Sequence, residues 1–187
     1  MRWSELRLPD SQWVIPRERA KNDREHVVHL SGLAVEIIEA LPRFARESNG
    51  GEGKSVGSDF ALTTTGESAI SGISRAKERL DNRMLERLRA ELAEAGEDSK
   101  EAAVGEWTLH DLRRTATTGM AKLSITPHVI DRILNHVSGT IRGVAAVYNR
   151  HAYLDERKAA LDAWSRYVES LVRPVEANIV QFVKAHS

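Results

Sequence analysis

The sequence predicts an α+β fold, in which a small three-stranded antiparallel sheet near the amino terminus precedes a mainly helical body. Short β-prone segments separated by turn residues fill the first part of the chain. Apolar residues recur at helical spacing through much of the remainder. We therefore expect a single domain over 1–187, with a sheet region at 1–30, a helical body at 31–172 and a tail helix at 173–187.

Three segments of the sheet region have the pattern of strands. Residues 3–8 (WSELRL) alternate apolar and polar side chains, as a half-buried strand does. Residues 13–15 and 26–30 are short runs rich in β-formers. The turn residues at 9–11 and the polar connection at 17–25 are short, so we expect the three strands to form an antiparallel meander.

Apolar stripes and end signals predict the helices. We expect helices at 32–41, at 73–95, after a Thr108–Asp111 capping box, after Thr126–Pro127 and at 153–171. The stripe of the first helix comprises Leu33, Ile37, Ile38 and Leu41, and the buried stripe of the third comprises Leu109, Leu112, Ala116 and Met120.

Gly- and Ser-rich residues at 49–58 predict a mobile loop, and 96–106 predict a second polar loop. The charged helix at 73–95 is expected to face solvent.

The composition is that of a soluble globular protein, with 41% hydrophobic and 29% charged residues. No apolar run is long enough to span a bilayer, and the first ten residues carry charges where a signal peptide needs apolar ones. The chain has no cysteine, which excludes thiolate nucleophiles and fits the cytoplasmic location that we expect. The net charge of zero counts against strong nonspecific DNA binding unless basic residues gather on one face.

Five polar residues are candidates for chemistry. His110 and Arg113 lie three apart at the start of a capped helix, so they share a face near an end that favours anions. His136 follows the next helix, Tyr148 follows a run of small residues, and Lys21 lies between the second and third strands. A guanidinium, further proton donors and a phenol are suited to attack on a phosphodiester.

The strings that contain these residues resemble the motifs of tyrosine recombinases, the phage integrase family. The resemblance rests on HDLRRT, ILNHVSG and AAVYNRHAYLDERKAALDAW, and is of the prophage and genomic-island type. It extends upstream through the region of the three strands and covers nearly the whole chain. It is weakest at 42–58, at 93–106 and in the last dozen residues.

The resemblance implies a role for each candidate. Tyr148 would attack the scissile phosphate and form a 3′-phosphotyrosine, and Arg113 would clamp the nonbridging oxygens. His110 and His136 would stabilise the developing charge, and Lys21 would protonate the leaving 5′ oxygen. Neither a metal nor another cofactor nor ATP is implied.

Two alternatives to Lys21 stay open at this point, because Lys54 or Arg17 could supply the proton instead. We expect Lys77 and Arg114 to contact DNA, although a charged helix face is more often simply solvated.

The resemblance also implies partners. Family members act on double-stranded attachment sites as tetramers and exchange carboxy-terminal segments, whereas without DNA we expect a monomer or weak dimer and no membrane association. The first of the family's two arginines has no match here. We therefore expect an amino-terminally truncated catalytic domain, weak or inactive alone, with a rate loss of about a hundredfold to a thousandfold.

Two other functions compete with the recombinase. A type IB topoisomerase would use the same catalytic set, and a noncatalytic remnant would only bind DNA or another protein. A lone Tyr148 would ordinarily be a half-buried aromatic residue, so the ordered set carries the prediction. His26 and His29 stand three apart on a strand and face opposite sides, so we expect no metal site there.

Overall fold

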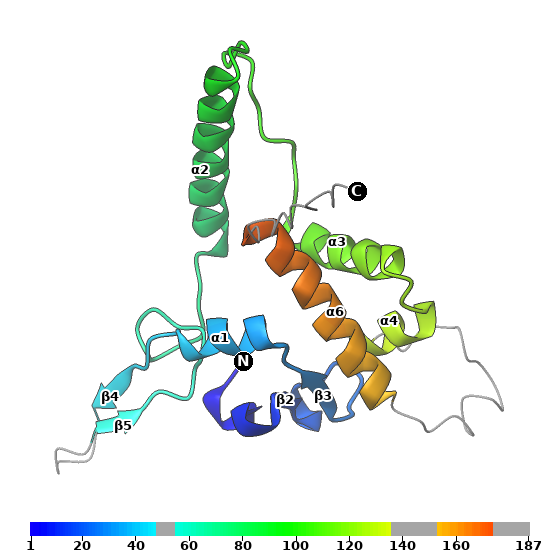
Figure 1. Ribbon diagram of the computed structural model, residues 1–187. Coiled ribbons are helices and arrows are strands. Elements are labelled where there is room, and N and C mark those ends of the chain that lie inside the picture. Colours follow the sequence, from blue (N-terminus) through cyan, green and yellow to red (C-terminus); the bar gives the residue numbers. More distant parts are fainter. Residues whose placement is uncertain (48–54, 136–152, 174–187) are drawn as a thin grey trace, which may run out of the picture. The chain divides into compact units, whose positions relative to one another are not determined.

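The computed structural model describes residues 1–47, 55–135 and 153–173 (Figure 1). The chain divides into two compact units. Unit 1 comprises Met1–Leu6 and Ile38–Thr115, and unit 2 comprises Arg7–Ile37 and Ala116–Ser187. The described residues form α-helices and short antiparallel strands, as the α+β prediction requires. The boundaries of a single domain over 1–187 stay a prediction.

The predicted three-stranded sheet is present. Its strands are β1 (Leu6–Arg7), β2 (Gln12–Ile15) and β3 (His26–His29), in the order β1-β2-β3. β2 and β3 are antiparallel, with Gln12 opposite His29 and Ile15 opposite His26. The order matches the meander that the turn residues predicted.

The prediction of a strand over 3–8 was wrong for most of its length. Two 3-10 turns, η1 (Trp3–Glu5) and η2 (Leu8–Asp10), flank β1 and leave only two residues in the sheet. The carboxylate of Glu5 accepts the backbone N–H of Arg2 at 3.0 Å, which closes η1. A local side-chain hydrogen bond therefore competes successfully with the strand conformation.

The predicted loop at 49–58 was also wrong in part. Strand β4 (Ala45–Glu47) pairs antiparallel with β5 (Ser55–Gly57), so the last residues of that loop lie in a hairpin. The ladder continues in the hydrogen bond from Ser58 N to Phe44 O, at 2.8 Å. Residues 48–54 lie outside the described residues.

The long helix of unit 1 is α2 (Ile73–Glu94). None of its side chains is buried, and Ile73, Leu80 and Met84 are more than two-fifths exposed. The prediction of a largely solvent-facing helix at 73–95 is confirmed.

Helix α3 (Leu109–Lys122) begins in unit 1 and ends in unit 2. Its predicted buried stripe was right for Met120, which is 1% exposed, and wrong for Leu109 and Leu112, which are 47% and 57% exposed. The helical period identifies a common face correctly, but burial also requires an element that packs on every turn of that face.

Unit 2 builds its core where helices α4 (Pro127–Ile133) and α6 (Leu154–Val172) pack together and α6 packs on β3 (Figure 1). Among the described residues of this unit, the buried apolar ones are Leu30, Met120, Val129, Ile130 and Ala160. Thr126 directly precedes α4 without a side-chain capping hydrogen bond, and Pro127 is the first residue of the helix, as predicted.

Helix α1 (Gly32–Glu39) runs across the unit boundary and buries Ile38. Ile37, predicted in the same apolar stripe, is 56% exposed. Of the tail predicted at 173–187, only Arg173 is described. None of the described helices has the length and apolar character that crossing a bilayer requires.

Candidate active site

The first turn of α3 is held by Thr108 and Asp111, the pair in which the sequence predicted a capping box, but only one of the two reciprocal bonds of such a box is present, because the Asp111 backbone N–H donates to the Thr108 carbonyl and not to its hydroxyl. The backbone N and the Oγ1 of Thr108 both donate to Oδ2 of Asp111, each at 2.8 Å. Nη1 of Arg114 donates to the other carboxylate oxygen at 2.9 Å. The hydrogen bonds from Thr108, and secondarily Arg114, hold the pKa of Asp111 below its ordinary value, so the cap stays ionised at neutral pH.

His110 and Arg113 both lie on this turn and are exposed. Their spacing of three residues places them on one face of the helix start, as predicted. Arg114 is three-quarters exposed and pairs with Asp111, so its guanidinium still presents donors to solvent. An exposed helix start with several cationic side chains can receive a phosphate group.

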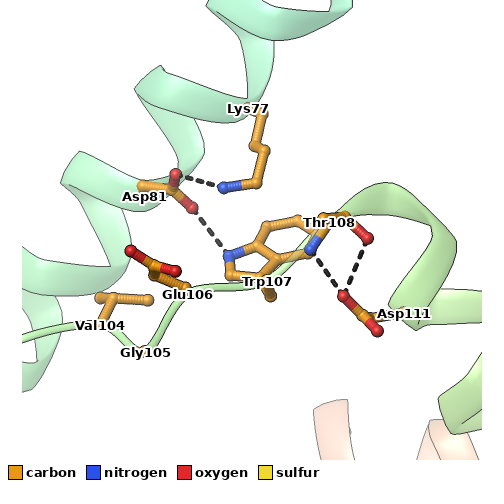
Figure 2. A pocket seen from close by; sticks show the side chains of 8 residues that line it. All are labelled: Lys77, Asp81, Val104, Gly105, Glu106, Trp107, Thr108 and Asp111. Atoms are coloured by element: carbon orange, nitrogen blue, oxygen red, sulfur yellow. Dashed lines mark hydrogen bonds and ion pairs between the residues drawn. The ribbon is translucent and has the colours of Figure 1, made fainter.

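The segment that leads into α3 is fastened to α2 (Figure 2). Nε1 of Trp107 donates to Oδ1 of Asp81 at 2.8 Å, and Nζ of Lys77 donates to Oδ2 of the same carboxylate at 2.7 Å. The Lys77 ammonium also lies 4.5 Å from the centroid of the Trp107 ring. These hydrogen bonds, Lys77 first, hold the pKa of Asp81 below its ordinary value despite opposing desolvation.

We call this three-residue arrangement of Lys77, Asp81 and Trp107 the α2 latch. It borders an open cavity of about 490 Å³ whose other walls include Glu106 and Asp111 (Figure 2). The Nζ of Lys77 is already engaged inside unit 1, so a DNA contact through it would have to compete with Asp81. A contact of Lys77 with DNA therefore remains a prediction, and the Asp81 carboxylate would compete with DNA for the Lys77 ammonium.

Lys21 belongs to unit 2 and is exposed in the connection between β2 and β3, where the sequence placed it. The connection begins with the 3-10 turn η3 (Arg17–Arg19). Arg17 binds Asp23 through a two-pronged contact at 3.0 and 2.8 Å, which lowers the pKa of Asp23 and raises that of Arg17. This engagement makes Arg17 a poorer proton donor than Lys21, while Lys54 lies outside the described residues.

His136 and Tyr148 also lie outside the described residues. The structure thus brings His110 and Arg113 together on one helix turn and places Lys21 in the other unit. Within the described parts of the chain, no group of three or more His, Asp or Glu side chains could hold a metal ion.

Four polar residues of unit 2 were not among those that the sequence predicted. Asp162 of α6 accepts a hydrogen bond from Nε2 of His29 at 2.8 Å, and Asn22 binds Asn135. Arg157 is 7% exposed and donates through Nη2 to the carbonyl of Val27. A signal for Arg157 existed, because it precedes Ala160 by three residues and Trp164 by seven, and so continues the buried face of α6.

His26 of β3 also faces the interior of unit 2. Burial is the main reason that its pKa is lowered, and the charge of Arg157 lowers it further. A hydrogen bond to the backbone of Ile133 opposes these effects only in part. The ring is therefore neutral at pH 7 and serves as a hydrogen-bonding group.

Comparisons with known proteins agree on one family. Residues 1–154 match the family model described as the phage integrase family. The chain is 28% identical over 169 residues to the prophage integrase IntA of Escherichia coli (strain K12). That alignment covers 90% of this chain but 34% of the relative, so the chain spans about a third of the length of the curated relative that it matches. No solved structure matches the chain.

Proposed function

The chain belongs to the phage integrase family of tyrosine recombinases, and from this premise we propose that it supplies the catalytic part of a site-specific DNA recombinase. The observation that carries the proposal is the start of α3. There the hydrogen bonds between Thr108 and Asp111 hold a turn that presents His110 and Arg113 on one exposed face, in the order along the chain that the family's motifs require.

The proposed reaction is a transesterification. The phenol of Tyr148 releases its proton to solvent and its oxygen attacks the scissile phosphorus, so that a bond from Tyr148 to the 3′-phosphate forms and the bond to the 5′ oxygen breaks. Lys21 gives its proton to the leaving 5′ oxygen. The phosphotyrosine keeps the phosphodiester's free energy, so a second 5′-hydroxyl can reverse the step without ATP.

The side chains of Arg113 and His110 would donate hydrogen bonds to the phosphate itself. The planar guanidinium of Arg113 would bind two nonbridging oxygens at once, and His110 would donate to the charge that develops on them. The helix start beneath both residues adds the positive end of its dipole. His136 would complete the set from the following segment.

The partners belong to the same proposal. Double-stranded attachment sites are the substrate, Lys77 and Arg114 are candidate contacts to DNA, and a tetramer on two duplexes is the working assembly. None of the 187 residues matches the first of the family's two arginines, so we expect cleavage by this chain to be slow.

The test is covalent trapping of the protein on DNA. The chain is incubated for hours with a pool of duplexes in which the position of the scissile linkage is fixed and the flanking base pairs are randomised. Each duplex carries a nick close to that linkage, so the short strand released by cleavage diffuses away. Gel electrophoresis in detergent should reveal a protein–DNA adduct. Tyr148→Phe lacks the attacking oxygen and should abolish the adduct.

The outcomes separate the competing functions. An adduct that persists in Tyr148→Phe would show that another residue is the nucleophile. Relaxation of supercoiled plasmid without dependence on a site would favour a type IB topoisomerase. Salt-sensitive DNA binding without any adduct would favour a noncatalytic remnant.

A further inference from the structure

One hydrogen bond inside unit 2 joins two residues that are 113 positions apart. Nδ2 of Asn22 donates to Oδ1 of Asn135 at 2.9 Å, in a partly buried position. Asn22 directly follows Lys21 in the β2–β3 connection, and Asn135 follows the end of α4. We call this contact the amide pair.

Packing alone does not account for an asparagine at position 22. Its Oδ1 is buried and has no hydrogen-bond partner among the described residues. A buried polar atom without a partner costs about 1–3 kcal/mol. An apolar side chain of similar size would avoid that cost, so the bond from Nδ2 to Asn135 is the better explanation for the amide.

The backbone of Asn135 suits the same contact. Its φ of 52° lies in the left-handed region, which asparagine tolerates better than most other residues with a side chain. Asn135 thus lies directly after the C-cap residue of α4, and its amide meets the β2–β3 connection there. Replacement by glycine would keep this backbone and remove only the amide.

A second tie holds the same two segments together. His26, four residues after Asn22, hydrogen-bonds to the backbone of Ile133, two residues before Asn135. Burial keeps the His26 ring neutral, so this tie does not depend on its charge at pH 7. The segment from Asn22 in the connection to His26 at the start of β3 is therefore held against the end of α4 at both of its ends.

This arrangement matters for Lys21 because a lysine side chain is long and has many rotamers. The exposed contact between Arg17 and Asp23 contributes little rigidity, since surface ion pairs are weak. We propose that Asn22 and Asn135 are positioning residues, which hold the backbone of Lys21 where its ammonium can protonate the leaving 5′ oxygen. This inference rests on the proposed function and does not depend on the place of His136.

The experiment compares two leaving groups. One duplex pool, with a fixed scissile linkage and randomised flanks, carries the natural bridging 5′ oxygen. A second pool carries a bridging 5′ sulfur at the same linkage. A thiolate leaves without a proton because thiols are far more acidic than alcohols, so a defect in the general acid disappears on the sulfur pool.

The variants are Asn22→Ala and Asn135→Gly, with Lys21→Ala as the reference and Glu25→Gln as a matched control. Glu25 is exposed in the same connection. Both asparagine variants should slow adduct formation on the oxygen pool by about tenfold or more, as expected for a displaced catalytic group. They should match the unaltered chain on the sulfur pool, as Lys21→Ala should, and Glu25→Gln should be normal on both.

The double variant Asn22→Ala with Asn135→Gly tests whether the two residues act as one. Its rate on the oxygen pool should equal that of either single variant, because each change removes the same bond. Equal slowing on the oxygen and sulfur pools would show that the amide pair serves the fold and would overturn the inference.

A different result distinguishes failure of the proposed function itself. If the unaltered chain forms no Tyr148-dependent adduct on either pool, the recombinase proposal fails, and the positioning role falls with it. If adducts form but sulfur does not rescue Lys21→Ala, Lys21 is not the general acid. The family function then stands and the positioning role is wrong.

Discussion

At the scale of single residues, Asp162 joins α6 to the sheet with one carboxylate. Its Oδ1 accepts from Nε2 of His29 and its Oδ2 accepts from Nζ of Lys158, each at 2.8 Å. Desolvation raises the pKa of Asp162, but the hydrogen bonds from Lys158 and His29 outweigh it and leave that pKa below the ordinary value of 3.8. The folded state therefore binds this proton less readily than the unfolded state does.

The lowered pKa of Asp162 predicts part of the acid sensitivity of the protein. The contribution to stability is fully present above about pH 4, the unfolded value, and is lost as the pH falls through the lower folded value. Asp162→Asn should lower the midpoint of thermal unfolding at pH 7 and reduce its further fall between about pH 4 and pH 2. A midpoint curve parallel to that of the unaltered chain would contradict this assignment.

Arg157 is buried in the same unit. Its hydrogen bond to the Val27 carbonyl and the tie between His26 and Ile133 both end on β3. The Val27 carbonyl of β3 thus has a hydrogen-bond partner in α6, and the His26 side chain has one in α4, as buried polar groups require.

At the scale of whole elements, α3 and α6 meet at a glycine. A Cβ placed on Gly119 would overlap Cζ3 of the Trp164 ring and lie 2.7 Å from Cη2. Both residues belong to unit 2. The missing side chain lets the indole lie flush against the helix backbone, which a larger residue would prevent.

Gly119→Ala should therefore destabilise unit 2. Alanine ordinarily stabilises a helix interior over glycine by about 1 kcal/mol, but the overlap should reverse the sign and cost about 1–3 kcal/mol. Urea unfolding followed by tryptophan fluorescence measures the change. Thr118→Ala, at an exposed neighbouring position, should be close to neutral.

A smaller side chain in place of Trp164 provides the complementary check. Trp164→Leu combined with Gly119→Ala should be less destabilised than the sum of the two single changes, because the leucine leaves room for the methyl group. If Gly119→Ala raises the urea midpoint, the two helices do not meet at this position.

Local chemistry was predicted well from the sequence, and contacts between distant elements were not. The Thr108–Asp111 cap and the Thr126–Pro127 start involve residues within one helical turn, so spacing alone identified them. The exposure of Leu109 and Leu112 depends on what packs against α3, which periodicity does not specify. The strand at 3–8 failed because one glutamate closed a local turn.

The candidate site follows the same division. The shared face of His110 and Arg113 and the place of Lys21 between two strands follow from spacing and order along the chain. The amide pair joins positions 113 residues apart, and Asp81 reaches Trp107 across 26. No period in a single sequence indicates which distant polar residues will meet.

At the scale of the whole chain, 27 basic residues balance 27 acidic ones. Part of this balance is local, because pairs four residues apart on helices, such as Lys77 with Asp81 and Arg87 with Glu91, engage their cations internally. The chain therefore has no excess of positive charge with which to replace the counterions around a duplex. Affinity without sequence recognition should accordingly be low.

Fluorescence anisotropy with a random-sequence duplex at several salt concentrations tests this expectation. The logarithm of the binding constant should fall with the logarithm of salt with a shallow slope, given that each neutralised phosphate contributes about −0.9. Arg114→Ala should make the slope shallower by about one such step if Arg114 contacts a phosphate. A steep slope, typical of many phosphate contacts, would show that the basic residues do gather on one face.

The α2 latch also makes the segment between α2 and α3 a suitable site for the insertion of a labelled peptide. The hydrogen bond between Asp81, inside α2, and Trp107, just before α3, ties together the elements on either side of that segment, and extending a loop costs only about 0.6 kcal/mol for each doubling of its length. An epitope or a dye-labelled peptide inserted beside Asp98, in an exposed turn, should leave the start of α3 in register. The protein thereby offers an attachment point for single-molecule work on DNA that needs no change near His110 or Arg113.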